Sequence, residues 1–187
     1  MEITYEIVKD EDVECCREVC NKLMAYQKSL AHYRPELFDD MNFDTRMLSS
    51  VKSSTHNFTV VAKADDKIVA YVYSNIAPKE NYDNEFATFF DLSTVRNDDV
   101  GCLSNFYIED GYRGQGIGSV LFNMSMEWLK GFPHVEDYFV FVSNGNDKAL
   151  EFYQNKGFQY SNKVLDGFIT TLRYADRVEA SKPLQAK

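Results

Sequence analysis

The sequence predicts an α/β fold in which strands alternate with amphipathic helices, and three observations support this prediction. Residues 103–108 form a short run rich in aromatic and branched side chains, which is typical of a strand. A glycine-punctuated loop follows, and apolar residues then recur near helical spacing over residues 119–130. Residues 57–64 and 67–76 are two strand-like runs separated by a turn of two aspartates, and they therefore predict a hairpin.

The chain before this hairpin predicts one strand and two helices. Apolar and polar residues alternate over residues 3–8, the period of a half-buried strand. A mostly apolar stripe marks a helix over residues 12–30, for which Asp10 is the expected N-cap. Pro35 breaks the chain, and a shorter helix is expected over residues 43–51.

Residues 78–97 match neither the strand period nor the helix period. The segment carries the acidic and large apolar residues Glu80, Asp83, Glu85, Phe86, Phe89, Phe90, Asp91 and Leu92. It could be a substrate-facing flap whose rings and carboxylates hold an amine. It could equally be a surface excursion whose rings pack against the fold, and both interpretations stay open.

The rest of the chain predicts further strands and helices in alternation. Residues 99–108 lead into the glycine loop as one strand, and residues 137–143 form a strongly apolar strand after the helix. A second helix is expected over residues 146–156, ending at a glycine. Residues 158–161 and 167–174 supply the last two strands.

Length and composition place the chain among globular proteins. It has 187 residues, of which 44% are hydrophobic, including 14 Phe and 12 Tyr, enough for a substantial core. We therefore expect a single domain over residues 1–174. The tail of residues 175–187 loses apolar content and is expected to be frayed.

Charge and residue usage exclude several classes of partner. The net charge of −9 argues against nucleic acid, whose binding rests on Lys and Arg, and suits a cationic amine only weakly. No apolar run is long enough to cross a bilayer, and the N-terminus does not have the shape of a signal peptide. A cytoplasmic protein without a membrane partner is expected. The four cysteines and three scattered histidines favour reduced thiols and no metal site.

The glycine loop predicts a site for an anion. The first turn of a helix leaves backbone N–H groups without partners and carries partial positive charge. Gly114, Gly116 and Gly118 let that backbone approach an anion closely, and Arg113 adds a fixed charge. Ser119 occupies the third glycine position of a dinucleotide fingerprint, and the Lys-Ser/Thr pair of a P-loop is missing. A phosphate or pyrophosphate ligand of another kind is therefore expected.

Two motifs resemble those of the GNAT superfamily of N-acetyltransferases. The segment Arg113-Gly114-Gln115-Gly116-Ile117-Gly118 is similar to its acetyl-CoA signature, Arg/Gln-x-x-Gly-x-Gly/Ala. Residues 146–158 match its pattern Asn-x-x-Ala-x-x-x-Tyr-x-x-x-Gly-Phe. The resemblance covers roughly residues 3–174. It implies a mixed, mostly antiparallel central sheet of about six or seven strands with helices on both faces.

The resemblance implies an enzyme that moves the acetyl group of acetyl-CoA to a primary amine of a small molecule or peptide. The strand around Phe106 and Ile108 would pair its backbone with the pantetheine amides, and one N–H would stabilise the oxyanion. Tyr153 would be the general acid for the leaving thiolate. The residues expected to bind acetyl-CoA are Phe106, Tyr107, Ile108, Arg113, Gly114, Gln115, Gly116, Ile117, Gly118, Ser119, Asn146 and Tyr153.

At the position where many members of the family carry their general base, this sequence has a different residue. Many members carry Glu where this sequence has Asn105, and asparagine cannot take a proton. Glu109 at the end of the same strand is the candidate, although it could be a solvated loop carboxylate. Asp91, Glu85 or Asp99 acting through water, or no dedicated base at all, also stay open.

A second function stays open beside the enzyme. Without a dedicated base, the chain could be a catalytically weak module that binds acyl-CoA and acts as a sensor or interaction domain. A homodimer also stays open, through an edge strand or through residues 78–97. The sequence does not identify the amine.

Overall fold

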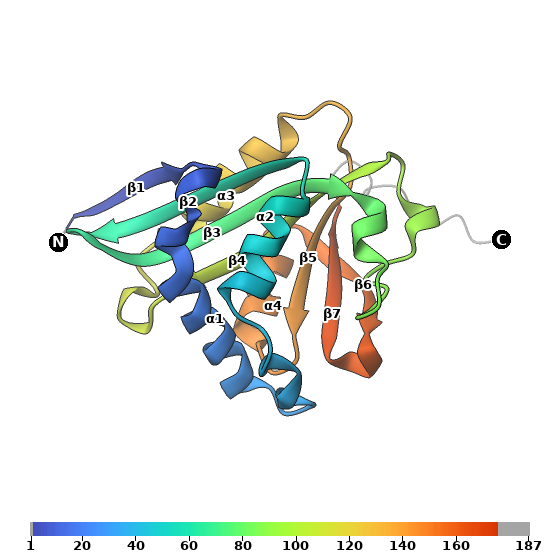
Figure 1. The fold of residues 1–187 in the computed structure, drawn as a ribbon, viewed down its shortest axis with the longest axis horizontal. Coiled ribbons are helices and arrows are strands. Elements are labelled where there is room, and N and C mark those ends of the chain that lie inside the picture. The colour runs from blue at the N-terminus through green and yellow to red at the C-terminus, as the bar shows by residue number, and fades with distance from the viewer. Residues whose placement is uncertain (1, 176–187) are drawn as a thin grey trace.

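The computed structural model describes residues 2–175, and Figure 1 shows one twisted sheet with helices on both of its faces. The strands are β1 Ile3–Val8, β2 His56–Ala64, β3 Lys67–Pro78, β4 Asp99–Ile108, β5 Tyr138–Ser143, β6 Phe158–Val164 and β7 Ile169–Tyr174. The seven strands lie in the order β1-β2-β3-β4-β5-β7-β6. Only the pairing of β4 with β5 is parallel. This confirms the predicted fold class. The tail expected to be frayed, beyond Ala175, lies outside the described residues.

The helices are α1 Arg17–Leu30, α2 Ser49–Ser53, α3 Ile117–Lys130 and α4 Asp147–Asn155. A 3₁₀ segment, Asp10–Cys16, precedes α1, so the expected helix 12–30 is α-helical only over its second part. Asp10 is not the N-cap, because the segment begins one residue earlier, after Lys9. The Asp10 carboxylate instead accepts a hydrogen bond from Asn57 at 3.0 Å.

Side chains of alternate residues in the central strands enter two separate cores. Val60 and Val72 lie in the core under α3, whereas Val61 and Tyr73 lie in the core under α1 and α2. The period of two explains why both hairpin strands read as continuous apolar runs. Each run is buried because helices cover both faces of the sheet.

The strands β4 and β5 part along their length. They pair only at Gly101 with Tyr138 and at Cys102 with Phe139. The register of β4 against β3 shifts so that Ser104 is an extra residue, and such a bulge bends the strand locally. Residues 103–108 therefore present an edge without a strand partner, and the gap beside that edge positions the site described below.

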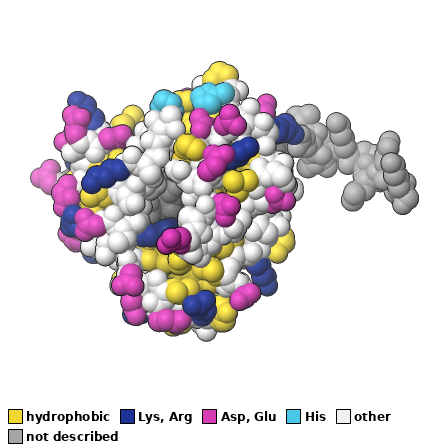
Figure 2. Space-filling model, turned by 45° about the vertical axis from the view of Figure 1, so that its right-hand side comes forward, with side chains coloured by type: hydrophobic (Ala, Val, Ile, Leu, Met, Phe, Trp, Pro, Cys, Tyr) yellow, Lys and Arg dark blue, Asp and Glu magenta, His cyan; other side chains and the backbone are white. Residues whose placement is uncertain are grey.

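The surface charges, the possible metal ligands and the helices of residues 2–175 indicate neither a metal centre nor a membrane span. On the face in Figure 2, acidic side chains are interspersed with basic ones rather than gathered into one patch. Within residues 2–175, no group of three or more His, Cys, Asp or Glu side chains could hold a metal ion. None of the helices described here is long and apolar enough to cross a membrane. Cys15 is exposed, and the other three cysteines are buried free thiols.

Candidate active site

The glycine loop has the open geometry that an anion site needs. Gly114 and Gly116 have positive φ angles of 73° and 84°, which an L side chain rarely adopts. A Cβ added to either glycine would meet no heavy atom within 4 Å. Gly116 is also the N-cap of α3, and no side chain caps that helix. The first N–H groups of α3 are therefore free of a capping side chain at a point where a ligand can approach.

Arg113 holds the loop in place. Its Nε donates to the carbonyl of Ile108 at 2.9 Å, and one terminal nitrogen donates to the Tyr26 hydroxyl at 3.1 Å. The same guanidinium pairs with Asp110 at 2.6 Å and lies 4.3 Å from the centre of the Tyr26 ring. These contacts order the loop.

Most of the residues expected to bind acetyl-CoA line one cavity, which we call the cofactor cleft. Its lining is Leu23, Tyr26, Phe106, Tyr107, Ile108, Arg113, Gly118, Asn146, Lys148, Ala149, Phe152 and Tyr153. The side chain of Asn146 caps α4 by accepting from the N–H of Ala149, as expected for a helix start. The other residues expected to bind acetyl-CoA do not line this cavity. They lie in the loop and the first turn of α3, and they are Gly114, Gln115, Gly116, Ile117 and Ser119. Sequence reasoning missed Tyr26 and Lys148.

Tyr153 lies where two cavities meet. It lines the cofactor cleft and also a narrow space between the parted strands, which we call the strand gap. The strand gap is lined from β4 by Leu103 and Ser104 and from β5 by Val140 and Phe141. Only 6% of Tyr153 is exposed, and burial raises the pKa of its phenol well above the ordinary value. The hydroxyl therefore keeps its proton at neutral pH and is available as a donor.

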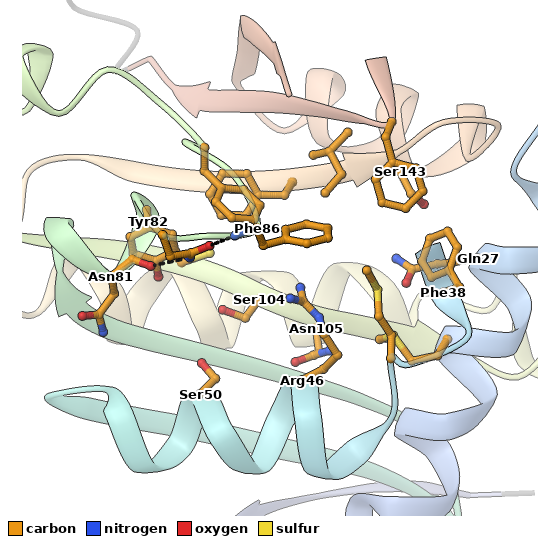
Figure 3. A pocket seen from close by; sticks show the side chains of 18 residues that line it. Gln27, Phe38, Arg46, Ser50, Asn81, Tyr82, Phe86, Ser104, Asn105 and Ser143 are labelled. Carbon is orange, nitrogen blue, oxygen red and sulfur yellow. Dashed lines mark hydrogen bonds between the residues drawn. The ribbon is translucent and has the colours of Figure 1, made fainter. Parts of the chain in front are cut away.

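A third cavity lies on the other side of the strand gap, and we call it the aromatic pocket (Figure 3). Ser104 and Phe141 line both the strand gap and this pocket, so the two spaces are neighbours. The wall of the aromatic pocket is formed by Met24, Gln27, Phe38, Met41, Arg46, Ser50, Asn81, Tyr82, Asn84, Phe86, Phe89, Cys102, Ser104, Asn105, Phe141, Ser143, Phe168 and Ile169. Of the described residues in this wall, Arg46 alone is charged.

The segment 78–97 contributes rings to the pocket but no carboxylate. Phe90 packs on Phe139 with ring centres 4.0 Å apart, as expected if the segment is a surface loop whose rings pack against the fold. Tyr82 and Phe86 line the pocket, as the flap interpretation expected. The carboxylates of the segment lie elsewhere, and that of Asp91 accepts from Ser93. Nothing in this placement supports the idea that these acids hold an amine.

The placement of Glu109 does not support its expected role as a base. Its carboxylate pairs with Lys22 of α1 at 2.7 Å and with Lys67 of β3 at 2.8 Å, and its side chain is 15% exposed. It lines none of the three cavities. Partial burial raises the pKa of Glu109, but the hydrogen bonds from both lysines outweigh this and hold the pKa below its usual range. The residue ties α1 to the sheet.

We expect Glu109→Gln to lower the free energy of unfolding by about 1–3 kcal/mol, between the values typical of exposed and buried ion pairs. Because the folded-state pKa lies below the unfolded value, this stabilisation is present above about pH 4.3 and is lost as the pH falls through the folded-state pKa. Urea titrations of both proteins between neutral and acidic pH should show the difference shrinking. Glu6→Gln, which loses only an exposed pair with Lys63, is the control. An equal loss in both variants would contradict the prediction.

Comparison with known proteins identifies the family. The model of the Acetyltransferase (GNAT) family matches residues 19–158. An uncharacterised N-acetyltransferase of Methanocaldococcus jannaschii is 29% identical over 84 residues, which cover 44% of this chain and 35% of that protein. The match thus spans about a third of that relative.

Two solved structures share the fold at low sequence identity. The PaiA N-acetyltransferase of Thermoplasma acidophilum, in complex with coenzyme A, has a TM-score of 0.65 and 16% identity, covering 94% of this chain and 100% of that one. NAA60 of Arabidopsis thaliana, in complex with a bisubstrate analogue, has a TM-score of 0.60 and 15% identity, covering 92% and 97%. From the family match over most of its length, the chain belongs to the GNAT family of acetyltransferases.

Proposed function

We propose that this protein transfers the acetyl group of acetyl-CoA to a primary amine by direct attack in a ternary complex. The observation that carries this proposal is the strand gap at the parting of β4 and β5, which shares lining residues with both the cofactor cleft and the aromatic pocket. A thioester in the cleft and an amine in the pocket would meet across this gap. The relative solved with a bisubstrate analogue, a ligand that combines both substrates, supports a ternary complex.

The residues of the chain fit acetyl-CoA. The open loop at Gly114 and Gly116 and the uncapped start of α3 suit a pyrophosphate. Lys156 lies nearby, donating to Ser119 at 3.2 Å, and adds positive charge at the same helix turn. The unpaired edge of residues 103–108 suits an extended amide chain, which can hydrogen-bond to it as an added strand would.

When bound, acetyl-CoA supplies an acyl group activated as a thioester. Tyr153 of the protein then acts as the proton donor for the leaving sulfur, because it lines both the cleft and the gap and its phenol keeps its proton. Backbone N–H groups of the β4 edge are the donors that would stabilise charge on the carbonyl oxygen.

Among the residues that the structure describes, no carboxylate or imidazole lines the cofactor cleft, the strand gap or the aromatic pocket. We therefore infer that the amine loses its proton to water rather than to a protein base. The missing base also favours the alternative function of an acyl-CoA-binding module with little turnover, and an assay of thiol release separates the two.

Thermal unfolding with and without CoA tests the assignment of the loop. A ligand at about 100 times its Kd stabilises the folded state by about 2.7 kcal/mol, which raises the Tm of a chain of this length by about 5–10 °C. We expect this rise in the wild-type protein and its loss in Gly116→Trp, whose ring would fill the open space above the loop. Gly116→Ala carries the same backbone strain and is the control, which should keep most of the rise.

Release of free thiol from acetyl-CoA, with a panel of amines, then tests turnover. A CoA-dependent rise in Tm together with amine-dependent thiol release supports the enzyme. The same rise without thiol release for any amine would support the binding module. No rise in the wild-type protein at saturating CoA would contradict both functions.

A further inference from the structure

The aromatic pocket holds a cation that has no counter-ion within residues 2–175. Arg46 lies in the π-helical turn Phe43–Leu48, and Figure 3 shows its side chain pointing into the pocket. Among residues 2–175, its guanidinium forms neither a hydrogen bond nor an ion pair. By contrast, four other arginines, Arg17, Arg34, Arg113 and Arg173, each pair with a carboxylate. Since these four arginines are paired, the unpaired guanidinium of Arg46 indicates that the pocket takes an anionic ligand.

The neighbours of Arg46 do not supply a negative charge. Its closest titratable neighbours include Cys102 and Tyr82, which also line the pocket. Burial raises the pKa of Cys102 to about 11 and also raises the pKa of Tyr82, so both are neutral at physiological pH. Burial lowers the pKa of Arg46, but a guanidinium stays protonated in proteins. The positive charge of the pocket is therefore uncompensated, in a chain whose net charge is −9.

Asn105 leaves the positive charge of Arg46 without a neutralising partner, so that an anion can bind it. Its side chain is 5% exposed, lines the same pocket, and points into it alongside Arg46 in Figure 3. A glutamate at this position would put a carboxylate into the pocket with Arg46 and would neutralise it. The amide instead leaves the guanidinium free and adds a donor that an anion can use.

The remaining wall fits an apolar group with further polar contacts. Rings of Phe38, Phe86, Phe89 and Phe141 line the pocket, whose volume is about 170 Å³. A cavity of roughly 150 Å³ is enough to hold a benzene ring. The buried hydroxyl of Ser143 faces the same pocket and has no hydrogen-bond partner among the described residues.

We propose that the acceptor amine also carries a carboxylate, which Arg46 binds, and an apolar group, which the rings of the aromatic pocket enclose. A free apolar amino acid has this combination of groups. The inference rests on the proposed acetyl transfer for the role of the amine, but the binding of the carboxylate is independent of turnover. Charge-assisted hydrogen bonds from a guanidinium to a carboxylate give the recognition its strength and direction.

Matched substrates test this inference by activity. L-Phenylalanine, L-phenylalaninamide and phenethylamine share the ring and the amine, but only the first has a carboxylate. Thiol release should give a kcat/KM about 10- to 100-fold higher for L-phenylalanine, calculated per unprotonated amine, the range expected for a hydrogen bond to a charged group. Arg46→Gln should remove this advantage mainly through KM, while activity with phenethylamine stays within about threefold. L-Leucine and L-methionine, each with its amide, extend the panel to other apolar side chains.

Binding of 3-phenylpropanoate, which has the ring and the carboxylate but no amine, tests the inference without turnover. Calorimetry on the CoA-loaded protein should show binding that Arg46→Gln weakens by about 10- to 100-fold. Asn105→Asp, which brings a carboxylate of nearly the same shape into the pocket, should weaken it similarly. Arg34→Gln is the control, because Arg34 pairs with Glu36 outside the pocket and its loss should change nothing.

The outcomes separate this inference from the proposed function. Binding of the carboxylate through Arg46 without thiol release from any amine would support the inference and count against acetyl transfer. Equal kcat/KM for the amino acids, their amides and phenethylamine would overturn the inference and leave acetyl transfer standing. Equal binding of 3-phenylpropanoate to the wild-type protein and Arg46→Gln would also overturn it.

Discussion

Tyr153→Phe is expected to reduce kcat for acetyl transfer by a factor of about 10²–10³, within the range by which general acids accelerate reactions. The substitution removes one hydroxyl at the junction of the cofactor cleft and the strand gap. That hydroxyl makes no hydrogen bond with any described residue, so the protein loses no internal contact. The ring keeps its edge contacts with Phe106 and Phe158, at 6.3 and 5.9 Å between centres. The folded state and the cofactor cleft should therefore be unchanged.

Three measurements distinguish loss of the proton donor from loss of structure. The Tm of Tyr153→Phe and its rise with CoA should match those of the wild-type protein, while kcat falls. Tyr71→Phe is the matched control, because it also removes the hydroxyl of a buried tyrosine, but Tyr71 lines none of the three cavities. Its kcat should be unchanged. Wild-type kcat in Tyr153→Phe would mean that the thiolate leaves without help from this phenol.

The regular elements could be predicted from the sequence because local patterns determine them. The strand β1, Ile3–Val8, follows from strict alternation, and the start of α4 follows from Asn146 as its cap. The 3₁₀ segment Asp10–Cys16 could not be predicted in this way. Its first carboxylate bonds to Asn57 on β2, a partner that only the folded chain brings near.

The geometry of the proposed cofactor side could be predicted for a related reason, whereas that of the proposed acceptor side could not. The backbone of the loop around Gly116 sets its own geometry, so a short motif describes it. The ion pairs of Glu109 could not be predicted, because its partners Lys22 and Lys67 lie 87 and 42 residues away in sequence. Arg46 gave no signal, because its direction depends on how the turn Phe43–Leu48 packs on the sheet. Distant contacts of this kind leave no period or motif in the sequence.

Gly145→Ala is expected to lower the free energy of unfolding by about 2–5 kcal/mol, which combines backbone strain with a steric clash. Gly145 lies in the turn between β5 and α4 with a φ of +81°. A Cβ there would lie 2.0 Å from the carbonyl oxygen of Leu30, at the end of α1. The neighbouring Asn144 accepts hydrogen bonds from the N–H groups of His32 and Tyr33. The turn therefore cannot move away from the end of α1 without breaking these hydrogen bonds. For a chain of this length the Tm should fall by about 5–15 °C.

The strain and the clash can be separated with Gly116→Ala as the matched variant. Gly116 has a similar φ of +84°, but a Cβ on it meets no atom within 4 Å, so it should cost only the strain of about 1–2 kcal/mol. The excess loss in Gly145→Ala then measures the contact between the turn and the end of α1. This contact also sets the pocket, because Ser143 lines the aromatic pocket and Asn146 lines the cofactor cleft on either side of the turn. The folded fraction of Gly145→Ala should therefore bind CoA more weakly. Equal Tm losses in the two variants would show that the turn relieves the clash at no cost in free energy, and would contradict the prediction.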